Sequence, residues 1–255
     1  MKQAAARGWA ATRVQSGVHP NFGPTRPQFD TVLPRVSDFQ RRQRQAGLAA
    51  PDGAHSTLQA TLEPALLQDL QRFEGGADKA TRPEVLEVVA AAVRHGRALR
   101  LLLEHDGLVL PLTVMPLERL VHAPLPLAQW GLLRWSGLKV LQVEAADSEA
   151  PVAHLAPLGV VLWALALHGT RADLLPEIAG PVAYRIAPST DFSGLNLAGT
   201  LASAVTRLRR RTTPLSEISA WPGLDRERAT RLLNGLYLQS GLIITRSHPV
   251  AGGSH

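Results

Sequence analysis

The last quarter of the chain, residues 196–248, carries the most regular succession of helix starts, apolar stripes and helix stops in the sequence. Apolar residues recur at helical spacing in its first segment, which ends in a basic cluster. The pair Thr213-Pro214 then offers a helix start with proline in the first turn, where its missing N–H costs nothing. After a turn at Pro222-Gly223, Asp225 is placed to cap a longer helix, and an apolar run over 242–245 follows. This order predicts a small unit of three helices closed by a strand.

This stretch, about a fifth of the chain, resembles the winged-helix superfamily. The resemblance implies that the third helix enters the major groove of DNA. On the outward side of this helix, at about 100° per residue, Thr230, Arg231 and Asn234 could read base edges. Glu227 repels phosphate, however, and Leu238 has no role on DNA. Units of this kind also resemble those at the ends of bacterial signalling proteins, where they mediate contacts.

We therefore predict a non-enzymatic bacterial regulatory or signalling protein whose winged-helix-like module contacts a protein partner. The alternative is a DNA-binding transcriptional regulator that uses the 225–240 helix as its recognition helix. Either function is compatible with a homodimer. The candidate contact residues are the same in each case: Arg207, Arg209, Arg210, Arg211, Arg226, Thr230, Arg231, Asn234 and Leu238.

The alternatives differ in what the folded chain should present. DNA binding predicts one continuous patch of arginines, from the end of the first helix to Arg231, with an affinity that falls steeply with salt. A protein-binding module predicts dispersed arginines and an exposed apolar patch near Leu238. An enzyme predicts a deep pocket with converging titratable groups, near His95, His105 and Asp106.

Patterns of catalytic and metal-binding residues are weak throughout the chain. There is no cysteine, which excludes disulfides, thiolate catalysis and cysteine metal sites. The nine histidines are scattered, and no two lie three or four residues apart as a helix-borne metal site requires. No nucleophile elbow, P-loop or dinucleotide-binding glycine pattern occurs. We therefore predict no catalytic residue, no metal and no cofactor.

The middle of the chain, residues 56–150, is predicted to be an α+β domain with a small sheet in the order β-β-α-β. Apolar runs over 99–103 and 108–115 flank Asp106-Gly107, and Asp-Gly between two apolar runs is a strong hairpin signal. A third strand is predicted over 138–144.

Four helices are predicted before, between and after these strands. The first begins near Ser56, ends at Gly75-Gly76, and has leucines at helical spacing: Leu58, Leu62, Leu66 and Leu70. Thr81 and Glu84 match a capping box at the start of the second. A tryptophan-containing helical stretch is expected over 129–135. The apolar run over 156–167 predicts a buried helix, because it is shorter than the roughly 20 residues that span a bilayer. Gly169 after it suits a left-handed helix cap.

The ends of the chain differ from the middle in charge. Residues 1–48 carry eight basic and two acidic side chains, residues 49–195 carry eleven and sixteen, and residues 196–255 carry eight and three. The basic ends could bind nucleic acid or an acidic partner, whereas solvated faces are the plainer explanation. Residues 1–55 are expected to be a basic, proline-rich flexible tail, with one or two helical turns over 38–45.

The expected whole is a helix-rich α+β protein in which residues 151–195 form a helix and a loop-rich connection to the module at 196–255. The N-terminus lacks the apolar block of a secretory signal, so we expect a cytoplasmic protein; its arginine-containing, acid-poor start is also typical of a transit peptide. The chain has 24 arginines against three lysines, a bias typical of GC-rich bacteria. Trp221, in the turn of the C-terminal unit, is less easily explained as a core residue.

Overall fold

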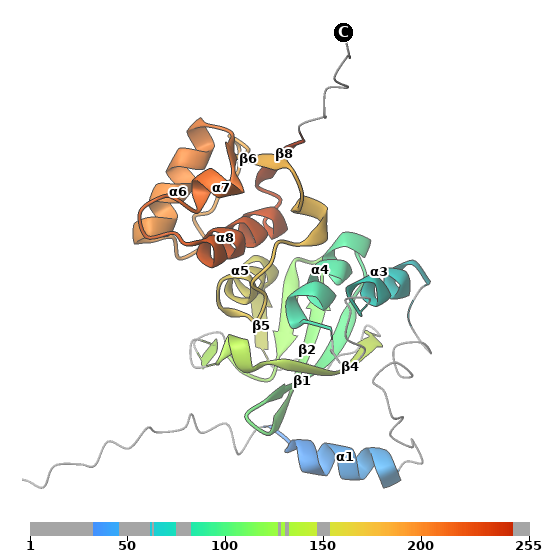
Figure 1. Cartoon of the computed structure of the whole chain (residues 1–255). Helices are drawn as coiled ribbons and strands as arrows, with labels where there is room; N and C mark the ends of the chain where they lie inside the picture. The colour runs from blue at the N-terminus through green and yellow to red at the C-terminus, as the bar shows by residue number, and fades with distance from the viewer. Residues whose placement is uncertain are drawn as a thin grey trace, which may run out of the picture.

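The computed structural model describes residues 33–45, 62, 64–74, 83–126, 129–130, 133–146 and 154–246. These residues form an α+β fold with a five-stranded antiparallel sheet and a smaller three-stranded sheet among helices (Figure 1). Most of the tail predicted over 1–55 lies outside the described residues. Its described part contains α1 (Val36–Gln45), a helix of ten residues and thus longer than the one or two turns expected. No helix of the described ranges is long and apolar enough to cross a membrane.

The larger sheet is built on the predicted hairpin. Strands β1 (Leu99–His105) and β2 (Leu108–Met115) pair in register around Asp106-Gly107. Both turn residues have positive φ, 48° and 81°, as a two-residue hairpin turn requires. The predicted third strand is β4 (Lys139–Ala145), which pairs with β1. The hairpin and the third strand are therefore confirmed.

Two further strands were not predicted from the sequence. They are β3 (Leu120–Ala123) and β5 (His154–Pro157), and they extend the sheet to the order β4-β1-β2-β3-β5. The helix expected over 129–135 is wrong: within its described residues the chain forms short 3₁₀ turns, the second being η2 (Trp135–Gly137). Trp130 holds this loop in place, because its indole N–H donates to Leu125 O at 2.9 Å.

Helices α3 (Pro64–Glu74) and α4 (Val85–His95) pack together beside the sheet. The prediction that Glu84 completes a capping box is wrong. That residue is itself the N-cap of α4, its side chain does not cap the helix, and its carboxylate instead pairs with Arg171. Thr81, the other half of the box, lies outside the described residues.

The buried apolar helix is confirmed as α5 (Leu158–His168). Its C-terminal Gly169 has φ −70° rather than the left-handed conformation expected. The glycine is needed for another reason: a Cβ there would lie 2.3 Å from Leu165 O, the carbonyl that accepts the Gly169 N–H.

The C-terminal unit contains the predicted helices and strand. They are α6 (Gly199–Arg210), α7 (Leu215–Ile218), α8 (Arg226–Leu238) and β8 (Leu242–Arg246). Asp225 caps α8 as predicted, because its Oδ1 accepts the Arg228 N–H at 2.7 Å. Pro214 is the N-cap of α7 rather than its first residue, and with Thr213 it forms the short strand β7 (Thr213–Pro214).

The small sheet of this unit is centred on a strand from the stretch predicted to be a connection. Strand β6 (Val182–Ile186) lies between β7 and β8 and pairs antiparallel with both. A 3₁₀ turn, η3 (Pro176–Ile178), precedes it, and Tyr184 donates its hydroxyl to Ile178 O at 2.7 Å. The C-terminal unit therefore includes residues that precede its predicted start at residue 196.

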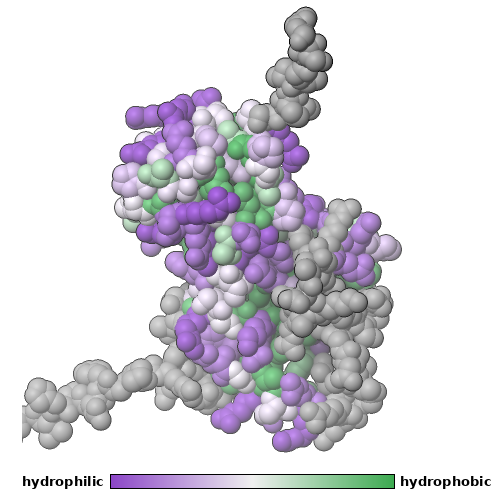
Figure 2. All heavy atoms as spheres, viewed as in Figure 1, coloured by the Kyte–Doolittle hydropathy of each residue, from purple (hydrophilic) through white to green (hydrophobic). Residues whose placement is uncertain are grey.

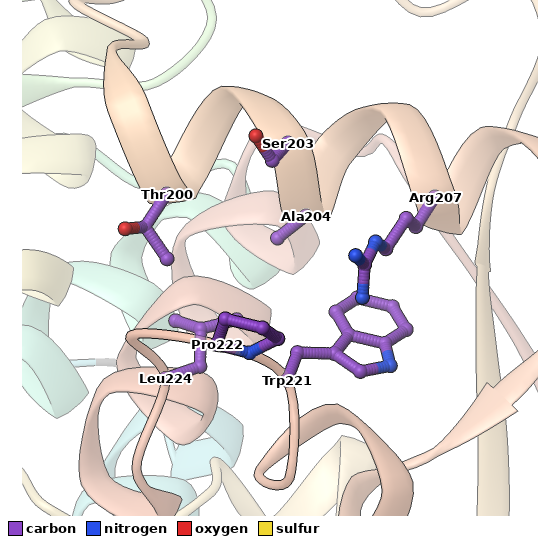
Figure 3. A pocket seen from close by; sticks show the side chains of 7 residues that line it. All are labelled: Thr200, Ser203, Ala204, Arg207, Trp221, Pro222 and Leu224. Carbon is purple, nitrogen blue, oxygen red and sulfur yellow. The ribbon is translucent and has the colours of Figure 1, made fainter.

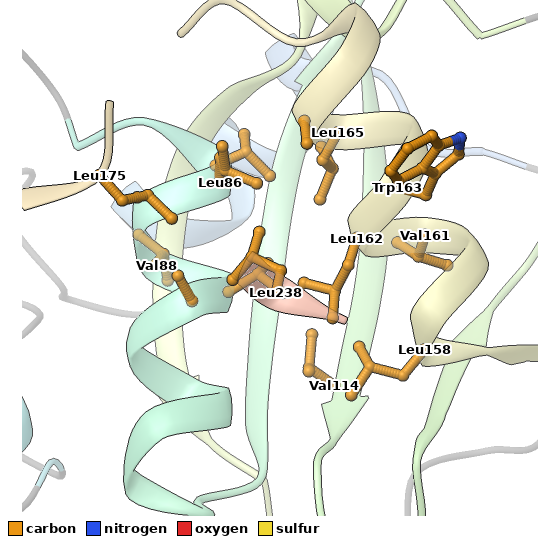
Figure 4. Packing of buried hydrophobic residues seen from close by; sticks show 14 of the residues in the cluster. Leu86, Val88, Val114, Leu158, Val161, Leu162, Trp163, Leu165, Leu175 and Leu238 are labelled. Carbon is orange, nitrogen blue, oxygen red and sulfur yellow. The ribbon is translucent and has the colours of Figure 1, made fainter. Parts of the chain in front are cut away.

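One hydrophobic core includes residues of both the larger-sheet part and the C-terminal unit. Figure 4 shows where they meet: α4 contributes Leu86 and Val88, β2 contributes Val114, and Leu238 comes from the end of α8. Between them lie side chains from α5, so α5 joins the larger sheet to the C-terminal unit.

Candidate interaction surfaces of the C-terminal unit

Most of the outward side of α8, predicted to contact a partner, is buried inside the chain, and Glu227 at its start is exposed. Thr230, Asn234 and Leu238 are 3%, 0% and 9% exposed. The opposite side of α8 is buried as well, on the side where α7 packs, and it consists of the predicted stripe of Ala229, Leu232, Leu233 and Leu236. The assignment of an exposed contact face to these three residues is therefore wrong, because α5 covers it.

Close approach of α5 and α8 depends on glycine. A Cβ at Gly235 would lie 2.8 Å from two ring carbons of Trp163 and 3.5 Å from the Cβ of Ala166. At the other end of the contact, Gln239 Nε2 donates to Gly159 O at 2.7 Å. The indole of Trp163 therefore lies directly on the backbone of α8.

The polar side chains of this interface have partners. Asn234 Oδ1 accepts the Leu175 N–H and its Nδ2 donates to Asp173 O, both at 2.9 Å. Arg231 Nη1 donates to Leu167 O at 3.0 Å and to Gly169 O at 2.7 Å. These carbonyls end α5, where a cation is favoured by the helix dipole. Arg231 thus serves the internal contact.

A second ionic contact holds the connection against α4. Arg171 pairs with Glu84 at 3.2 Å and with Glu87, and it also donates to Leu174 O at 2.8 Å. Burial raises the pKa of Glu87, although the charge of Arg171 opposes the rise. Because burial of one charge without the other is costly, this pair stabilises the packed arrangement of the connection.

Two of the four arginines at the end of α6 are engaged in contacts within the chain. Arg209 donates to Thr190 O at 2.6 Å and to Pro188 O at 3.2 Å, and Arg211 pairs with Glu217. Arg207 and Arg210 are exposed, and the side chain of neither makes a hydrogen bond or ion pair with another described residue. Arg226 is exposed at the start of α8. In the view of Figure 2, hydrophilic residues cover much of the outer surface of this unit.

A pocket of about 190 Å³ opens between α6 and the turn at 221–224 (Figure 3). The guanidinium of Arg207 lies 5.3 Å from the centre of the Trp221 ring, which forms one wall. Its lining combines hydroxyl, apolar and cationic groups, from Thr200, Ser203, Ala204, Arg207, Trp221, Pro222 and Leu224. The sequence marked Trp221 as unusual for a core residue but did not connect it with α6.

The turn at 221–224, which carries Trp221, is held by hydrogen bonds and lies close to α6. Gly223 has φ +75°, and a Cβ there would lie 2.8 Å from the hydroxyl oxygen of Thr200. Arg228 Nη1 donates to Gly223 O at 2.7 Å, and the Leu224 N–H donates to Trp221 O at 3.0 Å. The pocket is therefore preformed.

The histidines considered for an enzyme do not converge. His95 Nε2 lies 2.8 Å from the Asp69 carboxylate, before β1 begins. His105 is buried at the other end of β1, where its Nε2 accepts the Arg134 N–H at 3.1 Å. Within the described ranges, no group of three or more acidic or histidine residues could hold a metal.

A wider depression of about 620 Å³ lies where η2 faces the end of α5. Its cations are engaged in internal contacts: Arg134 pairs with Asp106 at 3.0 Å, and Arg231 binds the α5 carbonyls and Glu227. We therefore assign no ligand to it.

No family model matches the chain, and no curated protein and no solved structure is significantly similar to it.

Proposed function

We propose that the protein is a non-enzymatic regulatory or signalling protein whose C-terminal unit, a winged-helix-like module, binds a protein partner. The order of elements in this unit, strand, helix, strand, two helices around a turn, and strand, supports the resemblance. The binding region is the α6 surface, which consists of Thr200, Ser203, Arg207, Arg210, Trp221 and Pro222.

The burial of α8 carries this proposal, because it disfavours DNA reading by this helix. It also removes the exposed apolar patch expected near Leu238, which is 9% exposed, so the contact with a partner is assigned to α6 instead. A recognition helix must expose the side chains that read bases. Asn234 is 0% exposed and hydrogen-bonded to the connection, and Arg231 is bound to the end of α5. In this packing α8, the third helix of the unit, binds to the rest of the chain. The partner therefore binds on the other side of the unit, at α6.

The distribution of charge favours protein over nucleic acid. Proteins that bind DNA tightly neutralise about 6–10 phosphates. At the end of α6, Arg209 and Arg211 are engaged with the chain itself, which leaves the side chains of Arg207 and Arg210. The exposed carboxylates of Asp225 and Glu227 at the start of α8 oppose a phosphate backbone.

Site-specific photocrosslinking in the cells that make the protein tests the proposal. A photoreactive phenylalanine analogue replaces Ser203 on the α6 surface, with Arg185, exposed on β6, as the matched control position. We expect one defined, nuclease-resistant protein adduct at 203 and none at 185. A nuclease-sensitive adduct at 203, or no adduct, contradicts protein binding there. A salt-titrated DNA-binding assay on the full chain addresses the alternative, which requires measurable affinity at low salt.

A further inference from the structure

We infer that the α6 surface recognises an acidic peptide segment, in which an apolar side chain enters the pocket beside Trp221 and a neighbouring carboxylate binds Arg207. This inference rests on the proposed function and specifies the chemistry of the partner.

Arg207 is the anion-binding group. Its guanidinium carbon lies 5.3 Å from the centre of the Trp221 ring, and the guanidinium has no carboxylate partner among the described residues. A guanidinium over an aromatic ring keeps N–H groups open to a carboxylate, which they can bind with two parallel hydrogen bonds.

The pocket suits a single side chain. Its volume of about 190 Å³ is below the roughly 300–1,000 Å³ of sites that enclose small-molecule ligands. Ala204, Leu224 and Pro222 supply apolar contacts. The hydroxyl of Ser203 already donates to Gly199 O, at 3.3 Å. An aliphatic or aromatic side chain therefore fits this space better than a charged one.

The shape of the pocket exists before the partner arrives. The turn approaches α6 so closely that a side chain at Gly223 would meet Thr200, and Arg228 binds the Gly223 carbonyl. A preformed pocket spends little binding free energy on ordering.

A second cation extends the site along the helix. Arg210 lies three residues beyond Arg207, so the two side chains are neighbours on the surface of α6. The paired charges favour a segment with more than one acidic residue next to its apolar side chain. Phosphate groups would be attracted by the same charges, and the test includes them.

Selection from a phage-displayed library of random seven-residue peptides on the full-length protein tests this inference. We expect enrichment of sequences in which Asp or Glu neighbours a large apolar residue. Affinity of the best synthetic peptide is then measured by calorimetry against R207E, R207K and the matched charge reversal R185E. We expect R207E to weaken binding by at least about tenfold, R207K to weaken it less, and R185E to leave it unchanged.

The outcomes separate the chemistry of the partner from the function. Enriched peptides without acidic residues, or equal loss in R207E and R185E, overturn the acidic segment while the crosslink at Ser203 still supports protein binding. A 12-base-pair DNA duplex that binds more tightly than any peptide and is lost in R207E overturns it in favour of phosphate. No enrichment together with no crosslink overturns both. Circular dichroism and thermal unfolding confirm that each variant is folded, so a loss of binding reports on the site.

Discussion

At the scale of single residues, Gly235 shows how a helix-weakening residue can be required by packing. Glycine inside a helix costs about 1 kcal/mol relative to alanine, so G235A would stabilise α8 if the position faced solvent. The added methyl group would instead lie 2.8 Å from the Trp163 ring. We expect G235A to lower the free energy of unfolding by about 1–3 kcal/mol, measured by urea denaturation.

A matched glycine in the same interface provides the control. At Gly159 the nearest atom to an added Cβ is the flexible end of Gln239, also at 2.8 Å, and that side chain can move aside. G159A should therefore cost less than G235A. A more stable G235A protein would show that α5 and α8 do not pack in this way.

Asn234 makes the clearest polar contribution to the interface. N234A leaves the buried Leu175 N–H without its partner, and an unsatisfied buried group costs about 1–3 kcal/mol. The Asp173 carbonyl loses one of two donors, because it also accepts from Arg171 Nε at 2.9 Å. We expect thermal and urea unfolding to show a loss of about 1–3 kcal/mol. T230V is the control, because the Thr230 hydroxyl makes no hydrogen bond with another described residue. Equal losses in the two variants would contradict this role for Asn234.

At the scale of elements, Asp69 links α3 to α4. Its carboxylate accepts from Arg94 at 2.5 Å and lies 2.8 Å from His95 Nε2, while Arg94 also pairs with Glu177 of η3. Burial acts to raise the pKa of Asp69, but the hydrogen bonds and charges of His95 and Arg94 outweigh it and hold the pKa below the usual 3.8. A lowered folded-state pKa contributes stability above pH 3.8 and loses it as the pH falls through the folded-state value.

Comparison of the wild-type protein with D69N tests this link. We expect the wild type to be more stable at pH 7, and the difference to shrink as the pH falls below about 4, where Asp69 becomes protonated. Urea unfolding at pH 7, 5 and 3 measures it. A difference that stays constant down to pH 3 would contradict the ionic contribution.

Much of the element order was predictable because local signals carry it. The Asp106-Gly107 turn, the cap at Asp225 and the apolar run of α5 each act within a few residues. Strands β3 and β5 have four residues each, too few for a period to emerge. Strand β6 was not predicted because the prolines and glycines on both sides of it suggested loops. Its strand conformation depends on pairing with β7 and β8, which lie further along the sequence.

The candidate site was less predictable, because its contacts join residues that lie far apart in the sequence. Helical spacing divides α8 into two sides, but it does not reveal that both are covered. Residue 234 is buried by residues 173–175, about sixty positions earlier, and residue 235 by Trp163. Conversely, the pocket joins Arg207 to Trp221 across a turn, and no local pattern connects them.

At the scale of the whole molecule, the burial of α8 determines how the two parts behave together. Interfaces between domains of one chain are commonly polar and permit relative motion. Here apolar packing of α5 with α8 is combined with the contacts of Arg171, Arg231 and Asn234, and one core spans both parts. The C-terminal unit should therefore be held rigidly, with its α6 surface facing outward.

Such coupling predicts a single unfolding transition. We expect fluorine NMR of protein labelled with fluorotryptophan to show Trp130, in the larger sheet unit, and Trp221, in the C-terminal unit, losing their native signals at the same urea concentration. G235A should shift both midpoints equally, because it weakens the interface on which the common transition depends. If the Trp221 signal were lost at lower urea than that of Trp130, the C-terminal unit would open independently. The side of α8 that carries Thr230 and Asn234 would then be exposed in a populated state, and its contact with a partner or DNA would again become a physical option.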